Sequence, residues 1–362
     1  MRKIVCLAAA LLLVSMSVFA ADVTVSAQSA ILYDCTTGKV IYEKQVNEHC
    51  LIASTTKIMT GLLAAELYNL EQSVVIDAKW CGAEGSSMYL TAGETVTVKD
   101  LLYGLMLMSG NDAALALSCI YSGDSSDFVE LMNRKAAELG LRDTHFSNPS
   151  GLDEDDHYST ARDMARLAHY ALNNPIFAAV CATRQIETAG RFMTNHNKLL
   201  FLIPGAAGVK TGYTDEAGRC LVSAVERDGR KLIAVTFDAP DDWNDHEKLY
   251  DMGFYDMRVR NIIKSGMVGY AYAAGKGMVE LRIDNDVRYC LTAEEIDRLD
   301  IRLTGDRIVY GCRNEGDLYG EITVRLDGAV ICREPVYFCD NIEEELPKQT
   351  FWDKIKGIFT LR

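Results

Sequence analysis

The sequence predicts an α+β domain over residues 21–262, a small all-β domain over residues 263–345, and an amphipathic helix over residues 346–362. Three observations support this division. Strand-like runs at both ends of the first region enclose a helical middle, which predicts an antiparallel sheet built from distant segments. From about Lys264 the pattern changes to short strands separated by Gly and Asp turns. The last segment shows apolar residues at helical spacing.

Residues 1–20 have the features of a secretory signal peptide. A basic start precedes a nearly unbroken apolar run from Ile4 to Phe19, and small residues offer a cleavage point after Ala20. The run is about 16 residues long, which is shorter than the roughly 20 residues that a membrane-spanning helix needs. We therefore expect the protein to be exported, with an uncleaved anchor helix as the alternative.

Composition excludes several classes of function. The chain of 362 residues has a formal net charge of −14, and an acidic chain without a basic patch is not expected to bind nucleic acid. The sequence has no Cys/His spacing typical of a zinc site, so we expect no metal and no cofactor. Eleven cysteines are present, one of them in the signal peptide. In an exported protein the other ten either form disulfides or serve as small buried apolar residues.

Residues 21–262 place helices between two groups of strands. Two apolar runs around a Gly turn predict a β-hairpin, and a strand–turn–strand pattern closes the region. Between them, apolar residues recur at helical spacing. The predicted strands are 29–33, 39–42, 208–212, 220–225 and 232–237, and the predicted helices are 54–68, 100–108, 113–118, 127–139 and 161–172. In the β domain the predicted strands are 279–283, 307–310, 319–326 and 329–333.

Ser54 and Lys57 form the first of three elements that carry chemistry, at the start of an apolar helix. A spacing of three residues puts both side chains on one helical face. A serine hydroxyl needs a base to take its proton, and a lysine can be that base only when burial or a second cation lowers its pKa. Alone, Ser-x-x-Lys is common and marks only a solvated helix start.

Ser109, Gly110 and Asn111 form the second element, on a break between two apolar helices. A hydroxyl there can relay a proton between the lysine and a leaving amine, and the carboxamide can hydrogen-bond a substrate amide. Taken singly, these residues indicate no more than a turn, which Ser, Gly and Asn all favour.

Lys210, Thr211 and Gly212 form the third element, at the end of a predicted strand. The lysine supplies a cation that can attract a substrate carboxylate, and the threonine adds a hydrogen bond. Because glycine lacks a Cβ, an extended peptide can lie against the strand edge at this position. By itself the element indicates a strand end with a surface lysine.

Together and in this order, the three elements resemble the signature of penicillin-binding proteins and class A β-lactamases. The surrounding sequence is similar to the low-molecular-mass penicillin-binding proteins, the serine-type D-alanyl-D-alanine carboxypeptidases of peptidase family S11. The similarity implies a β-lactamase/transpeptidase-like domain and removal of the terminal D-alanine from peptidoglycan pentapeptides. The stretches that carry it, within residues 25–262, are 53–60, 101–106, 109–114, 148–152, 159–164 and 208–214.

The resemblance also implies which residues catalyse the reaction. Ser54 would be the acylated nucleophile and Lys57 its base. Ser109 would pass a proton to the departing D-alanine. The backbone N–H groups of Ser54 and Tyr213 would form the oxyanion hole. β-Lactams would act as covalent inhibitors at the same serine.

Substrate binding would fall to Asn111 for the peptide amide and to Lys210 and Thr211 for the terminal carboxylate, with Gly212 and Tyr213 completing the set. Some relatives add an arginine after the Lys-Thr-Gly hairpin, but residues 241–246 contain none. Arg219 is a candidate to replace it, although a side chain that faces solvent is favoured at this position.

Other activities are alternatives at this point. A β-lactamase of class A needs a glutamate between the second and third elements, where Glu130 lies within an apolar-periodic helix and is expected to occupy a helix face. A D,D-endopeptidase would share the same site. A penicillin sensor would need a second apolar span, which the sequence lacks. A Ser–His–Asp hydrolase lacks a G-x-S-x-G context, and His157 is expected to cap or pack.

Residues 346–362 predict a membrane-surface anchor. Apolar residues at positions 351, 352, 355, 358 and 359 form one helical stripe, and basic residues lie on or beside the other face. A helix docked on the β domain is the alternative. We expect an extracytoplasmic protein, bound peripherally to the outer face of the cytoplasmic membrane, whose β domain raises the active site towards the wall.

Overall fold

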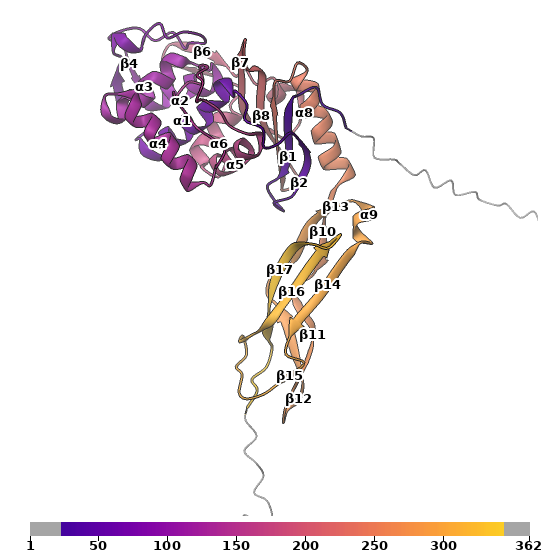
Figure 1. Ribbon diagram of the computed structural model, residues 1–362. Coiled ribbons are helices and arrows are strands. Elements are labelled where there is room, and N and C mark those ends of the chain that lie inside the picture. Colours follow the sequence, from indigo (N-terminus) through magenta and orange to yellow (C-terminus); the bar gives the residue numbers. More distant parts are fainter. Residues whose placement is uncertain (1–22, 344–362) are drawn as a thin grey trace, which may run out of the picture.

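The computed structural model describes residues 23–343, which form two regions joined end to end (Figure 1). The predicted signal peptide (1–20) and the predicted amphipathic helix (346–362) lie outside the described residues. Within residues 23–343, no helix is both long and apolar enough to cross a membrane. The ten cysteines of the described part are all free thiols, and only Cys312 among them is exposed.

A five-stranded antiparallel sheet organises the N-terminal domain, with the strand order β2-β1-β9-β8-β7. The N-terminal strand β1 pairs with β9 in a register that runs from Ser29 opposite Phe237 to Asp34 opposite Leu232. The predicted antiparallel sheet of distant segments is therefore confirmed. The strands are β1 (Ser29–Asp34), β2 (Val40–Lys44), β7 (Ala206–Thr214), β8 (Gly218–Arg227) and β9 (Arg230–Phe237).

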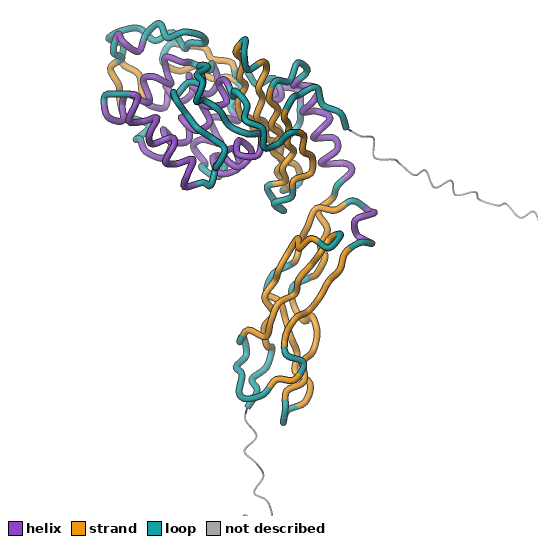
Figure 2. The backbone as a smooth tube through the Cα atoms, viewed as in Figure 1, coloured by secondary structure: helices purple, strands orange, loops and turns teal. Residues whose placement is uncertain are grey.

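Helices cover both faces of this sheet (Figures 1 and 2). On one face α1 lies at the centre of a helical group, with α5 packed against β1 and β9. On the other face α8 packs against β8 and β9. The helices are α1 (Lys57–Leu67), α2 (Val98–Leu107), α3 (Asn111–Ser122), α4 (Ser125–Glu138), α5 (Ala161–Ala171), α6 (Pro175–Ala182), α7 (Leu199–Leu202) and α8 (Asp242–Asp251).

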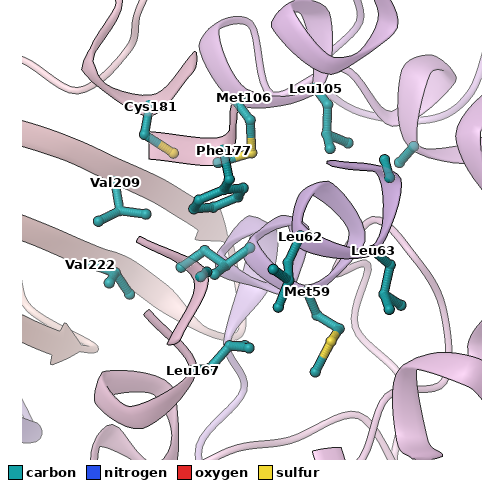
Figure 3. Close-up of a cluster of buried hydrophobic side chains, with 14 of the residues drawn as sticks. Met59, Leu62, Leu63, Leu105, Met106, Leu167, Phe177, Cys181, Val209 and Val222 are labelled. Atoms are coloured by element: carbon teal, nitrogen blue, oxygen red, sulfur yellow. The ribbon is translucent and has the colours of Figure 1, made fainter. Parts of the chain in front are cut away.

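An apolar core joins α1 to the sheet and to its neighbouring helices. Figure 3 shows Met59 and Leu62 of α1 among side chains from α2, α6, β7 and β8. Burying such side chains supplies most of the stability of the domain. It also fixes the start of α1, and hence Ser54 and Lys57, relative to β7.

Short elements complete the N-terminal domain. The 3₁₀ turn η1 leads directly into α1, and Asp228 and Gly229 take positive φ angles of +51° and +74° in the turn between β8 and β9. Such a turn suits the twist of a two-residue hairpin. The remaining elements are η1 (Ala53–Thr56), η2 (Ala78–Trp80) and the hairpins β3 (Ser73–Val75) with β4 (Thr95–Thr97) and β5 (Gln185–Thr188) with β6 (Arg191–Thr194).

The second region is a β domain, as the sequence predicts, with one short helix. A six-stranded sheet has the order β14-β16-β17-β12-β11-β15, and β10 pairs with β13. Because β10 begins at Arg258, strand structure starts a few residues before the predicted boundary at 263. The elements are β10 (Arg258–Ile263), β11 (Gly266–Ala273), β12 (Gly277–Ile283), β13 (Val287–Leu291), α9 (Ala293–Ile296), β14 (Leu299–Gly305), β15 (Ile308–Val309), β16 (Leu318–Leu326) and β17 (Ala329–Phe338).

Polar contacts connect the two domains next to the π-helical turn η3 (Met252–Asp256). Lys39 of the N-terminal domain forms an ion pair with Glu295 at 2.8 Å. Arg230 pairs with Asp34 at 2.8 Å and also reaches the thiol of Cys290, at 2.8 Å, in the β domain. These contacts place β13 and α9 against the β1–β2 and β8–β9 ends of the sheet.

Candidate active site

Ser54 lies in η1, directly before α1, where a 3₁₀ turn presents its side chain to an open pocket. Its Oγ is 2.8 Å from Nζ of Lys57, the first residue of α1. Ser54 is half-buried, whereas Lys57 is fully buried. The two residues that the sequence pairs on one helical face therefore meet across one helical turn.

Two carbonyl oxygens hold the amine of Lys57 in place. Nζ donates to Oδ1 of Asn111 at 2.6 Å and to the backbone oxygen of Ser150 at 2.5 Å. Burial lowers the pKa of Lys57 well below its usual range, and the positive charge of Lys210 lowers it further. A neutral amine has two N–H bonds and one lone pair. A neutral amine at this position would keep its two N–H bonds on the two carbonyls and direct its lone pair at the hydroxyl of Ser54.

The loop around Ser150 is shaped to deliver this carbonyl. Oδ1 of Asn148 accepts hydrogen bonds from the backbone N–H groups of Ser150 at 3.1 Å and Gly151 at 2.7 Å. Gly151 has a φ of +88°, and a Cβ there would lie 1.9 Å from the backbone oxygen of Ala53. Any larger residue would push the loop away from η1. The loop is thus a positioning element for Lys57.

Asn111 stands at the start of α3 and links Lys57 to a segment that covers the site. Its Nδ2 donates to the backbone oxygen of Glu84 at 2.5 Å. The next residue, Asp112, is fully buried and accepts hydrogen bonds from the backbone N–H groups of Met88 at 3.0 Å and Leu90 at 2.9 Å. Asn111 and Asp112 therefore fix residues 84–90, from which Ser86 reaches the pocket.

Ser109 lies between α2 and α3 and lines the same pocket as Ser54. It has a φ of +58°, in the left-handed region that costs a non-glycine residue about 1 kcal/mol. Within residues 23–343 its hydroxyl makes no hydrogen bond to another side chain. It is therefore free to bond with a bound substrate.

Lys210 lies on β7 and is fully buried. Its Nζ donates to the backbone oxygen of Thr211 at 2.7 Å. Burial lowers the pKa of Lys210 to about 7. Desolvation and the charge of Lys210 also lower the pKa of His196, which lines the pocket. The site thus holds two buried lysines, and the charge of Lys210 works against protonation of Lys57.

The pocket has a volume of about 270 Å³ and opens beside the free edge of β7, the outermost strand of the sheet. Thr211, Gly212 and Tyr213 of β7 form one wall. A Cβ on Gly212 would lie 3.0 Å from the backbone nitrogen of Ser54. Glycine is therefore needed here for close packing against η1, a reason that the sequence reasoning did not anticipate.

Arg219 matches one expectation and adds to it. Its side chain is 42% exposed, as expected of a residue that faces solvent, but it also lines the same pocket as Ser54, together with Asp242 and Trp243. Its guanidinium donates to the Asp242 carboxylate at 2.8 and 3.1 Å through Nη2, and lies 5.7 Å from the centre of the Trp243 ring. The carboxylate of Asp242 is 5% exposed and orients the guanidinium at the pocket wall, while the Arg219 side chain itself remains open to solvent.

Two other residues match their expected roles. His157 is buried and hydrogen-bonds with Oγ1 of Thr56 at 2.7 Å and with the backbone N–H of Ser147 at 3.0 Å. Burial lowers its pKa to about 4, so it is a neutral packing residue. Glu130 is exposed on α4 and does not line the pocket. Sequence reasoning missed Ser86, His196, Asp242 and Trp243, which belong to no motif.

Comparisons with known proteins agree on one family. The family model described as D-alanyl-D-alanine carboxypeptidase, peptidase S11, matches residues 16–241. The D-alanyl-D-alanine carboxypeptidase DacF of Bacillus subtilis is 34% identical over 328 residues, which cover 86% of this chain and 84% of DacF.

Solved structures extend the similarity to the fold. Penicillin-binding protein 5 of Haemophilus influenzae superposes with a TM-score of 0.75 at 26% identity, covering 89% of this chain and 98% of that chain. Penicillin-binding protein D2 of Listeria monocytogenes, in an ampicillin-bound form, has a TM-score of 0.60 at 32% identity and covers 64% of this chain and 99% of that chain.

Proposed function

Since the chain belongs to the D-alanyl-D-alanine carboxypeptidases of peptidase family S11, we propose that Ser54 is its acylated nucleophile and Lys57 the general base. The family makes it a serine-type carboxypeptidase, a hydrolase of the cell wall. The observation that carries the assignment of residues is the position of the buried Lys57 amine, which contacts the carbonyl oxygens of Asn111 and Ser150 and lies 2.8 Å from Ser54 Oγ.

Acylation follows from this geometry. The Ser54 hydroxyl gives its proton to the neutral amine of Lys57, and Oγ attacks the carbonyl carbon of the penultimate D-alanine. The N–H groups of Ser54 and Tyr213 stabilise the tetrahedral oxyanion, where Gly212 of β7 packs against the backbone nitrogen of Ser54. The protonated Lys57 keeps its contacts with Asn111 and Ser150 in this step.

Release of the terminal D-alanine needs a proton on its amine nitrogen. Ser109, whose hydroxyl faces the same pocket, passes this proton from Lys57 to the leaving group. Water then attacks the acyl ester of Ser54, with Lys57 again as the base, and the shortened peptide leaves. The substrate is the peptidoglycan stem peptide that ends in D-Ala-D-Ala.

The free edge of β7 receives the peptide in extended form, with Thr211, Gly212 and Tyr213 along it. The terminal carboxylate binds near Lys210 and Thr211. Arg219 adds a guanidinium oriented by Asp242, and so takes the place of the arginine that residues 241–246 lack. Asn111 holds Lys57, and its expected role towards the substrate amide stays a prediction, because its Nδ2 donates to the backbone oxygen of Glu84 and it is not among the residues that line the pocket.

A β-lactamase is the second candidate, because it shares the acylation step. Among the described residues that line the pocket there is no glutamate to activate a water for fast deacylation. This favours a stable penicilloyl ester, as in a carboxypeptidase that β-lactams inhibit. A D,D-endopeptidase would use the same residues on a cross-linked peptide.

Benzylpenicillin labelling tests the assignment. Intact-mass analysis and peptide mapping should place one penicilloyl group on Ser54, and Ser54→Ala should abolish labelling. Ser86→Ala, at a pocket serine that lies outside the three sequence elements, should keep the label. A penicilloyl group on any other residue would show that the assignment is wrong.

The location proposed for the enzyme is extracytoplasmic, with residues 346–362 resting on the membrane surface. The apolar run in residues 1–20 and the amphipathic stripe near the C-terminus support it. In a flotation assay with acidic phospholipid, the full chain should float and a chain that ends at residue 347 should not. Equal behaviour of the two chains would contradict the anchor without affecting the catalytic proposal.

A further inference from the structure

A second cavity, of about 590 Å³, lies where the two domains meet, and we call it the junction pocket. One wall is the β8–β9 turn, residues 227–230, with Thr36. The other wall comes from η3, the start of β10 and Arg288 of β13. Figure 1 shows the β10 and β13 end of the β domain beneath the sheet of the N-terminal domain. None of its lining residues lines the catalytic pocket.

Positive charge gathers at this pocket although the chain as a whole carries −14. Its lining includes four arginines and one acidic residue, Asp228. Arg230 is neutralised by the buried carboxylate of Asp34, at 2.8 Å. Among residues 23–343, the other three arginines (Arg227, Arg258 and Arg288) form no ion pair with a carboxylate.

The neighbouring carboxylate of Asp286 offsets only part of these charges and forms no ion pair with the three arginines within residues 23–343. Asp286 is near enough to Arg288 for the arginine to contribute to the lowering of its pKa, but its carboxylate accepts hydrogen bonds from the backbone N–H of Ser265 at 2.8 Å and from Asn261 at 3.0 Å. Arg258 and Arg288 are both exposed, so their guanidinium groups are available to a ligand.

An aromatic ring orders the inner arginines. The Arg227 guanidinium carbon lies 4.7 Å, and that of Arg230 5.6 Å, from the centre of the Phe254 ring. Such contacts hold a guanidinium without using its N–H donors. One N–H group of Arg227 donates to the backbone oxygen of Pro204 at 3.2 Å, and its other N–H groups are free to bind an anion.

We propose that the junction pocket binds a phosphate-bearing ligand. Guanidinium groups form paired hydrogen bonds with phosphate oxygens, and three of them without a counter-ion repel one another until an anion enters. The volume exceeds that of a single phosphate and suits a phosphorylated organic group. Because the walls come from both domains, the bound ligand would also hold the domains together.

Calorimetric titration of the full chain tests this proposal with two separate probes. Inorganic phosphate represents a phosphate monoester, and glycerophosphoglycerol represents a phosphodiester. The double variant Arg258→Gln/Arg288→Gln should bind at least about tenfold more weakly, because two charge-assisted contacts are lost. Arg260→Gln is the matched control, since Arg260 is an exposed residue of β10 that does not line the pocket.

The expected pattern is binding by the wild type and by Arg260→Gln, weakened in the double variant and by added salt. Absence of binding by the wild type, or equal affinity in all three proteins, would overturn the proposal. Penicillin labelling of Ser54 should be unchanged in every variant, so this result is independent of the catalytic assignment. Unchanged thermal unfolding of the double variant shows that it folds.

Discussion

The two domains treat buried polar groups in opposite ways. Among the described residues, the N-terminal domain buries two lysines, an arginine, two histidines and six aspartates, whereas the β domain buries only Thr323 among its polar side chains. A buried charge costs several kcal/mol unless partners satisfy it. The N-terminal domain therefore buries charged groups around its candidate site, while the β domain has an apolar core with almost no buried polar side chains.

The buried charges of the N-terminal domain also differ from one another. Lys57 contacts a hydroxyl and two carbonyl oxygens, while Lys210 donates only to the backbone oxygen of Thr211. Both have lowered pKa values, mainly because of burial. These contacts fit the role of base proposed for Lys57, and they fit Lys210 as a nearby cation that loses its proton above about pH 7. Substitutions can separate these roles.

The largest effect is expected at Lys57. Lys57→Ala removes the amine that lies 2.8 Å from Ser54 Oγ, and acylation by benzylpenicillin should slow by at least about 10⁴-fold, the upper end for general base catalysis. Stopped-flow or mass-spectrometric acylation rates measure it. Lys79→Ala, at an exposed lysine of η2, should acylate at the wild-type rate. A loss smaller than tenfold at Lys57 would mean that another group takes the proton.

A stability difference between the domains comes next. Asp112→Ala leaves the N–H groups of Met88 and Leu90 without their buried acceptor, and should lower the free energy of unfolding by about 3 kcal/mol. Thr323→Val in the β domain loses only a hydrogen bond to Glu321, and should change the free energy of unfolding by less than about 1 kcal/mol. Denaturant unfolding followed by probes in each domain measures both. Similar losses would contradict the contrast between the domains.

Arg219 should affect substrate binding more than chemistry. Arg219→Gln removes the guanidinium but keeps a hydrogen-bond donor, so KM for a peptide with a free C-terminal carboxylate should rise by about tenfold. KM for the C-terminal amide should barely change. Asp242→Asn, which frees the guanidinium from its buried partner, should raise KM for the free acid as well. Equal effects on acid and amide would remove Arg219 from the carboxylate site.

Much of the fold was predictable because local pattern and burial agree. Helices α1, α4 and α5 and the hairpin β8–β9 fall within a few residues of their predicted ranges. The helix α8 escaped prediction because its buried face includes Asp245 and His246. Their partners come from distant segments: the backbone of Ser26 precedes β1, and the hydroxyl of Ser223 lies on β8. The spacing of apolar residues cannot reveal a helix whose buried face contains polar side chains.

The site shows the same limit. The three motifs predicted pocket residues around Ser54, because each motif consists of residues that lie close together in the sequence. The carbonyl of Ser150 and the orientation of Arg219 depend on tertiary contacts, with Lys57 and with Asp242 respectively. Neither has a local signal. Sequence could identify the reacting groups but not the groups that orient them.

The last prediction concerns Lys210 and pH. In the unfolded chain this lysine keeps its proton up to its ordinary pKa of 10.5, whereas in the folded protein it loses the proton above about 7. Between these values the unfolded state binds more protons, so raising the pH favours the folded state. From pH 7 to 8.5 the Lys210 contribution should raise the free energy of unfolding by about 1.5 kcal/mol.

Lys210→Met isolates this contribution, because it fills the same space without a titrating group. The wild type should gain about 1.5 kcal/mol more than the variant over this pH range, measured by urea unfolding at each pH. Above pH 8.5 the thiols of the unfolded chain begin to ionise, while burial raises the pKa of Cys181 and Cys220 in the folded protein. The folded state then binds more of these protons, so the thiols lower the free energy of unfolding as the pH rises, and they do so in both wild type and variant. Parallel curves for wild type and variant would show that Lys210 keeps its proton when buried, and it would then have to be a permanent cation that repels protons from Lys57.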